Sequence, residues 1–244
     1  MLIIQKPIQP EWGELLPESC PLGIVLSLDK PYGWTSADAV RKIKFVLQRQ
    51  WRIKNLKVGH AGTLDPLATG ILLICIGKAT KAAESLQAQE KEYIASIRLG
   101  ATTPSFDLEK EIDQTFPYTH ITEDAIANTL LGMTGPQQQI PPQFSAKIID
   151  GVRAYEWARS GIQTALKPAQ IEIYEAKLLQ CRLPDVVVQI RCSKGTYIRA
   201  FARDLGLALG SGAHLTDLVR SKNGPFLLDR TITMEDFSKI FTQK

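Results

Sequence analysis

Apolar and polar residues alternate along several stretches of the chain, and this alternation predicts β-strands. Between positions 92 and 99 the side chains of Tyr93, Ala95, Ile97 and Leu99 fall on one face. The unbroken apolar run Ile71–Ile76 predicts a strand that is buried on both faces. Further strands are expected at 23–28, 171–181 and 185–192.

Apolar residues at helical spacing predict helices between these strands. After Thr35 or Ser36, either of which can cap a helix, Val40, Ile43 and Leu47 lie on one face. The residues 196–209 show the same spacing and are followed by Gly210. Other helices are expected at 79–87, at 122–132, at 155–160 and after Thr233, whereas the Pro- and Gln-rich residues 135–152 indicate a long loop.

These elements follow one another without a regular β-α-β rhythm. The mixture favours an α/β protein of the α+β type, with a mixed, largely antiparallel sheet flanked by helices and loops. Residues 1–22 contain several prolines and are expected to form a mostly irregular N-terminal arm. Residues 23–244 are then expected to form a single domain.

The composition is that of an ordinary globular protein. Of the 244 residues, 44% are hydrophobic and 22% are charged, which argues against disorder and against collagen-like repeats. The apolar run at 71–76 falls far short of the ~20 residues that a membrane span needs, and the N-terminus does not resemble a signal peptide. The cysteines are spread widely, without a C-x-x-C pair or a zinc-like spacing. We therefore expect a reduced, cytoplasmic protein without a structural metal.

Basic residues are concentrated in two segments, although the net charge is only +4. Residues 39–64 contain no acidic residue and seven basic ones, namely Arg41, Lys42, Lys44, Arg49, Arg52, Lys54 and Lys57. Residues 189–203 again lack acids and carry four basic residues. Such segregation can build a face that attracts nucleic acid. The alternative is a helix with an ordinary solvated basic face.

The segment 58–70, with the sequence VGHAGTLDPLATG, is the most unusual in the chain. It places Asp65 between a glycine-bearing turn and Pro66, directly before a predicted buried strand. Glycines let the backbone approach a ligand closely, and the proline restricts Asp65 to an extended conformation. These features fit a carboxylate with a fixed direction, although an isolated Asp-Pro more often caps a turn.

Other motifs accompany this segment in a fixed order. They are Leu28-Asp29-Lys30-Pro31 with Gly33, Thr35 and Ser36; Lys91-x-Tyr93 with Arg98-Leu99-Gly100; 140–147 with Gly151 and Tyr155; 192–199; and 212–215 with Leu218, Arg220 and 224–226. Together with 58–70 they resemble the TruB family of tRNA pseudouridine synthases, from about residue 23 to about residue 237.

The resemblance implies the pseudouridine synthase fold for residues 23–244 and an isomerase that needs no cofactor. Such an enzyme breaks the N-glycosidic bond of a uridine, turns the base and rejoins it through carbon. The resemblance assigns the nucleophile to Asp65, by attack on the sugar or through a glycal-like route, and pairs this aspartate with Arg199. It places the ring of Tyr93 against the target base. Without the resemblance, Tyr93 would be expected in the core and Arg199 on a helix surface.

The remaining site residues are implied in the same way. Tyr197 and Leu218 match positions that line the base pocket, and His60 matches a residue that stacks into the RNA in place of the extruded base. Lys30 and Lys147 are expected either to face RNA or to support the site. Core packing is the alternative for Tyr197 and Leu218, and a solvated side chain is the alternative for each lysine.

The implied substrate is the uridine at position 55, in the TΨC stem-loop of tRNA, which must be flipped out of its loop. No membrane and no obligate protein partner is implied. The chain is expected to lack the C-terminal PUA domain of many bacterial members. A tRNA-binding or tRNA-folding chaperone without catalysis is the alternative function. A hydrolase built on His60 and Asp65 is disfavoured because no ligand cluster accompanies them.

Overall fold

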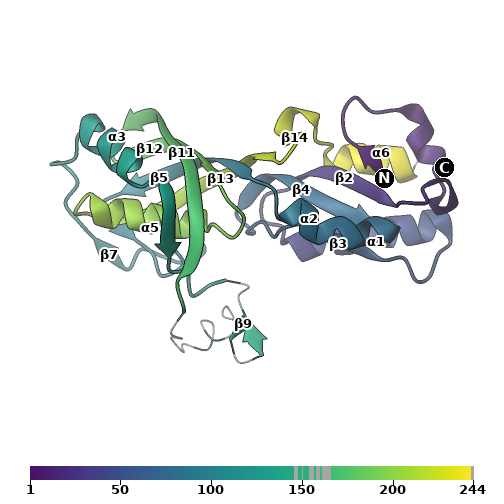
Figure 1. Ribbon diagram of the computed structural model, residues 1–244, viewed down its shortest axis with the longest axis horizontal. Helices are drawn as coiled ribbons and strands as arrows, with labels where there is room; N and C mark the ends of the chain where they lie inside the picture. The colour runs from purple at the N-terminus through teal and green to yellow at the C-terminus, as the bar shows by residue number, and fades with distance from the viewer. Residues whose placement is uncertain (146–147, 150, 154–156, 158–159, 161–165, 243–244) are drawn as a thin grey trace. The chain divides into compact units, whose positions relative to one another are not determined.

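The chain folds into two compact units in a computed structural model that describes residues 1–145, 148–149, 151–153, 157, 160 and 166–242. The first unit contains residues 1–92 and 219–244, and the second contains residues 93–218. The chain passes from the first unit to the second within strand β5 (Lys91–Leu99) and returns within β13 (Ala213–Asn223). Both chain termini lie in the first unit (Figure 1).

The strands of the first unit are mostly antiparallel. β2 (Ile24–Lys30) pairs with β4 (Ala68–Ile76) from Ile24 opposite Ile76 to Lys30 opposite Gly70. β1 (Leu2–Ile4) runs parallel to β2, and β3 (Val58–His60) runs antiparallel to β4. β14 (Phe226–Leu227) pairs with the end of β13, which is the next strand after β4 in the order β1-β2-β4-β13. As predicted, the apolar run at 71–76 forms a fully buried strand.

The helices of the first unit are α1 (Ser36–Trp51), α2 (Ala83–Gln87) and α6 (Met234–Thr242). Thr35 begins α1 through a capping box with Asp38, as its position before the apolar stripe predicted. Ile43 and Leu47 of α1 pack into a core cluster that also holds residues from β2, β4 and α6. Alternate residues of β4, including Ile71 and Leu73, enter a second cluster. Burial on both faces therefore fixes the register of β4.

The second unit is built on long antiparallel strands. β11 (Ala169–Arg182) pairs with β12 (Asp185–Cys192) on one edge and with β8 (Gly135–Gln139) on the other. The order is β13-β5-β12-β11-β8. Short strands pair separately, β6 (Ala101–Thr102) with β7 (Gln114–Thr115) and β9 (Ile148–Ile149) with β10 (Val152–Arg153).

Within the described residues, the second unit contains the α-helices α3 (Glu123–Gly132) and α5 (Ile198–Ala208). Thr122 caps α3 by accepting a hydrogen bond from the backbone N–H of Ala125 at 3.2 Å. The apolar face of α5, which includes Phe201 and Leu205, is buried as the helical spacing predicted. Gly206 allows this helix to lie against the chain at residue 213, because a Cβ at Gly206 would be 2.5 Å from the Ala213 nitrogen.

The prediction of an α/β protein of the α+β type, with a mixed and largely antiparallel sheet, is confirmed. The expected long loop at 135–152 is wrong in part, because β8 pairs with β11 and two short strands follow. Within the arm expected at 1–22, the structure contains β1 and two 3₁₀ helices, Pro10–Glu14 and Pro17–Ser19, and it buries Trp12. The helix expected at 155–160 falls largely outside the described residues.

No helix within the described residues is long and apolar enough to cross a membrane.

Candidate active site

Asp65 lies in a loop of the first unit, between the end of β3 and the start of β4, and its side chain is half-buried. Ser36, in the first turn of α1, fixes this loop through Leu64. Its Oγ accepts a hydrogen bond from the Leu64 N–H at 2.9 Å and donates one to the Leu64 carbonyl at 3.0 Å. The Asp65 carbonyl accepts a bond from the N–H of Ala68 at 3.1 Å. The backbone on both sides of the carboxylate is therefore held in place.

Lys30 supports the same loop from the end of β2. Its side chain has no exposed surface, and Nζ donates to the carbonyls of Pro31 (2.9 Å), Trp34 (2.6 Å) and Pro66 (3.2 Å). Burial lowers the pKa of Lys30 to about 8, against the opposing effect of the Asp65 charge. Two roles were expected for Lys30, contact with RNA or support of the site. Its Nζ bonds to backbone carbonyls, which fits support of the site.

Arg220, on β13, is a second buried cation behind the Asp65 loop. Its guanidinium donates to the carbonyls of Ile71 (2.6 Å), Thr63 (3.3 Å) and Gly62 (3.3 Å). β4 approaches β13 closely here, because a Cβ at Gly70 would be 2.4 Å from the Arg220 carbonyl oxygen. Arg220 was predicted only as part of a motif, without a role of its own. Its place in that motif was the one indication of a role, because the sequence does not show that the side chain is buried.

His60 ends β3, opposite Ile74 of β4, and is half-buried. Burial lowers its pKa from 6.5, and the positive charge of Arg220 lowers the pKa further. A hydrogen bond with the backbone of Gly62 acts in the opposite direction. His60 is therefore neutral near pH 7, the form in which a ring stacks without bringing a further cation. Within the described residues, no three His, Cys, Asp or Glu side chains gather in a way that could hold a metal ion.

The second unit holds Arg199 in the first turn of α5, where only 4% of the residue is exposed. Its guanidinium donates to the Ser105 carbonyl at 3.3 Å and to the Phe144 carbonyl at 2.9 Å. Its Nε lies 3.6 Å from Oδ2 of Asp107, which is also buried. Asp107 was not predicted as a site residue, because no motif singles it out.

Three further predicted residues lie in the second unit. Tyr93 of β5 and Leu218 of β13 are buried, at 8% and 7% exposure, and Tyr197 is half-buried just before α5. Gln139 of β8 fixes the Tyr197 backbone. Its Oε1 accepts a bond from the Tyr197 N–H at 2.8 Å, and its Nε2 donates to the Tyr197 carbonyl at 3.1 Å. No motif or pattern indicated Gln139, which lies in the segment expected to be a loop.

The predicted site residues are thus divided between the units. Lys30, His60 and Asp65 belong to the first unit, where Lys30 donates a hydrogen bond to the carbonyl of Pro66 in the Asp65 loop. Tyr93, Tyr197, Arg199 and Leu218 belong to the second. Lys147 lies outside the described residues. The pairing of Asp65 with Arg199 stays a prediction.

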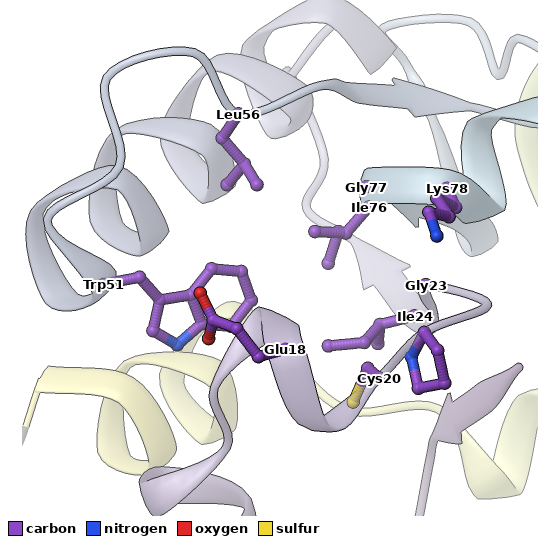
Figure 2. A pocket seen from close by; sticks show the side chains of 10 residues that line it. Glu18, Cys20, Gly23, Ile24, Trp51, Leu56, Ile76, Gly77 and Lys78 are labelled. Carbon is purple, nitrogen blue, oxygen red and sulfur yellow. The ribbon is translucent and has the colours of Figure 1, made fainter.

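A separate pocket of about 390 Å³ opens in the first unit, at the far end of α1 (Figure 2). Its wall is largely apolar, with Cys20, Ile24, Trp51, Leu56 and Ile76, and it also includes the charged residues Glu18 and Lys78. None of the predicted site residues lines it. The pocket is therefore distinct from the Asp65 loop.

Comparison with known proteins gives the class of this protein. A family model described as "TruB family pseudouridylate synthase (N terminal domain)" matches residues 48–198, and "tRNA pseudouridylate synthase B C-terminal domain" matches residues 199–244. Fold and motifs thus define a pseudouridine synthase, which is an isomerase. The chain belongs to the TruB family. The predictions of this family and of this enzyme class are confirmed.

Similar proteins agree with this assignment. Proteins named tRNA pseudouridine synthase B from Bacteroides fragilis and Phocaeicola vulgatus are 51% and 52% identical over 91% of this chain, and they are covered over 95% and 94% of their own lengths. Among solved structures, a chain of a Cbf5-Nop10-Gar1 complex matches with a TM-score of 0.68 and 30% identity. That match covers 89% of this chain and 54% of the other.

Proposed function

We propose that this protein converts uridine to pseudouridine at position 55, in the TΨC loop of tRNA, in the cytoplasm. The observation that carries the proposal is the Asp65 loop, in which Lys30, Ser36 and Arg220 hold the backbone around one half-buried carboxylate. A nucleophile gains most from such support, because its direction is set before the substrate arrives. The close relatives named for this reaction in tRNA support the choice of substrate.

The proposed reaction starts with the target nucleotide extruded from its loop. In one route the Asp65 carboxylate attacks C1′, so that a bond from its oxygen to C1′ replaces the C1′–N1 bond and breaks again when C5 attacks C1′. In the glycal-like route the carboxylate instead takes a proton from C2′ and returns it later. The bond between C1′ and N1 breaks, the base turns, and a bond between C1′ and C5 forms. The proton on C5 is lost and N1 gains one, so the product is an isomer of the substrate and no oxidant or reductant is consumed.

Other residues take the roles that the family resemblance implies. Arg199 pairs with the Asp65 carboxylate, and the buried Asp107 lies 3.6 Å from Nε of the same guanidinium. Tyr93 lies against the target base and helps to move the proton, while Tyr197 and Leu218 line the base pocket. The neutral His60 stacks where the extruded base has left, as aromatic rings do with unpaired bases. Lys30 acts as a support, and Lys147 is proposed to face the RNA.

Replacing Asp65 tests the proposal directly. We expect Asp65→Asn and Asp65→Ala to abolish pseudouridine formation in an unmodified tRNA transcript, because each removes the nucleophile. Affinity for tRNA should change by no more than a few-fold, since phosphate contacts supply most of the binding. Single-turnover assays with excess enzyme and a separate binding titration measure the two quantities.

The matched control is Asp229→Asn, which neutralises an exposed aspartate in the same unit. It should leave both rate and affinity at the wild-type level. Near-normal product formation by Asp65→Ala would remove Asp65 from the mechanism. Wild-type protein that binds tRNA without modifying it would favour the chaperone alternative instead.

A further inference from the structure

The outer face of α1 carries four cations around one exposed aromatic ring. At 100° per residue, the side chains of this face fall within about one third of the helix circumference. Its residues are Arg41, Lys42, Phe45, Arg49 and Arg52, the last directly after the helix, and all are exposed. Phe45 itself is 59% exposed. Because Ile43 and Leu47 are fixed in the core on the opposite side, the helix cannot turn to hide this face.

The positive charge of the α1 outer face is largely uncompensated. Within the part of the chain that the structure describes, Arg41 alone among these cations has an acidic partner, Asp38. The segment 39–64 contains no acidic residue at all. An ordinary solvated helix face mixes both signs of charge along its length. This one presents a single sign, which suits a polyanion.

Arg52 is placed on this face at a cost to the backbone. It ends α1 in the left-handed region, with φ 55° and ψ 33°, and its N–H donates to the Gln48 carbonyl. Helices usually place glycine at such a position, because a side chain there is strained. Glycine would serve the fold better, so the cation indicates a use for the side chain itself.

The face starts at the Asp65 loop and runs away from it. Ser36 in the first turn of α1 bonds to Leu64, the neighbour of Asp65, at 2.9 and 3.0 Å. The 16 residues of α1 span about 24 Å. Arg49 and Arg52 come 13 and 16 residues after Ser36, which is about 20 and 24 Å along the helix axis. This distance is beyond the reach of a single nucleotide held at Asp65.

We propose that the α1 outer face binds the phosphate backbone of the substrate tRNA outside the arm that carries the target uridine. The inference rests on the proposed function, which supplies the polyanion. Cations on phosphates give affinity that does not depend on base sequence. The exposed ring of Phe45 adds a surface on which an unpaired base can stack.

Two RNAs and two double variants test this surface. Arg49→Gln/Arg52→Gly removes two cations from the far end of the face, and Lys78→Gln/Arg230→Gln removes two exposed cations elsewhere in the same unit. The RNAs are an unmodified tRNA transcript and its isolated T-arm hairpin. For the first variant we expect at least about fivefold weaker binding to tRNA and a salt dependence reduced by about two counterions. Its affinity for the hairpin should match the wild type.

Thermal unfolding separates binding from folding. Because glycine suits the left-handed position, Arg52→Gly should keep or raise the melting temperature while it weakens tRNA binding. Wild-type affinity of the α1 variant for tRNA would overturn the proposal, as would an equal loss on the hairpin or in the control variant. Wild-type protein that binds tRNA through this face but forms no pseudouridine would instead overturn the proposed function.

Discussion

Lys30, Arg199 and Arg220 are cations with almost no exposed surface, and backbone carbonyls accept their hydrogen bonds. A buried charge costs free energy unless such bonds replace its hydration. The alternatives of a solvated Lys30 and a helix-surface Arg199 are therefore wrong. All three side chains tie together loops that carry or adjoin predicted site residues.

The ion pair between Arg199 and Asp107 should contribute to folding. Asp107→Asn keeps the shape of the side chain but removes the negative charge that lies 3.6 Å from the buried Nε of Arg199. We expect the free energy of unfolding to fall by about 2–3 kcal/mol, somewhat less than for a pair that loses every contact, because the two carbonyl bonds of Arg199 remain. Urea denaturation measures this change.

An exposed ion pair in the same unit provides the comparison. Asp185 accepts two hydrogen bonds from Arg98, at 2.8 and 2.9 Å, with about half of each side chain exposed. Asp185→Asn should cost less than about 1 kcal/mol, since solvent screens the pair. Equal losses for both variants would show that burial adds nothing to the Arg199 pair.

The pKa of Lys30 gives stability a defined pH dependence. Burial lowers this pKa from 10.5 to about 8, so the folded protein releases the proton at a lower pH than the unfolded chain. Between these two values the unfolded chain binds more protons, and the free energy of unfolding rises with pH. Compared with Lys30→Met, the wild type should gain about 2 kcal/mol from about pH 8 to about pH 10.

Denaturant unfolding of both proteins across this range measures the difference and cancels the titration of the other groups. Lys30→Met is expected to be less stable at every pH, because three carbonyls lose their donor. A difference that stays flat, or that shrinks as the pH rises, would contradict the lowered pKa.

At the scale of elements, the close approach of β4 to β13 is what places Arg220 behind the Asp65 loop. Gly70 makes the approach possible, because it has φ +93° and no Cβ to meet the Arg220 backbone. The N–H of Gly70 also donates to Asp29 Oδ1 at 3.0 Å. The start of β4 is therefore fixed to β2 and to β13 at a single residue.

Gly70→Ala should be strongly destabilising. Its Cβ would lie 2.4 Å from the Arg220 oxygen and 2.8 Å from the Arg220 nitrogen, and backbone cannot move aside as a flexible side chain can. We expect a loss of about 2–4 kcal/mol in urea denaturation. Gly59→Ala, on β3 with no heavy atom within 4 Å of the added Cβ, should cost less than about 1 kcal/mol. Similar values for the two variants would refute the close-approach argument.

The elements that the sequence predicted share a regular apolar pattern, as in β5, α1 and α5. β13 was not predicted, because it buries polar residues such as His214, Arg220 and Asn223 at positions that an apolar pattern would fill. β8 was missed for a similar reason, since its glutamines form a polar edge of the sheet. Periodicity detects a strand only where burial and hydrophobicity coincide.

For the molecule as a whole, the family motifs in the sequence located the candidate site residues. The residues that hold them in place were identified only in the structure. Asp65, Tyr93 and Arg199 were predicted because they match motifs. Asp107 and Gln139 were not, because their partners are distant in sequence: Asp107 contacts a helix residue 92 positions later, and Gln139 bonds to a backbone 58 positions later. Contacts of this kind depend on the complete fold.

The whole enzyme should work without a metal ion. Its described residues include no group of three potential ligands, and the isomerisation needs no metal-activated water. We expect EDTA to leave the single-turnover yield of pseudouridine unchanged. A melting curve must show that the tRNA stays folded in the chelator. Loss of activity that a divalent cation restores on folded tRNA would count against this expectation.

The hydrogen bonds from Arg220 to the Asp65 loop also imply an order of events during synthesis of the chain. Arg220 reaches back to Gly62 across 158 positions of the chain. A ribosome therefore completes the Asp65 loop long before it adds Arg220, which follows the last residue of the second unit by two positions. Closing so long a stretch is entropically costly and slow compared with forming local turns. Until Arg220 is added, the growing chain can hold the Asp65 loop only through Lys30 and Ser36, so the full set of contacts around the aspartate forms after the second unit has been synthesised.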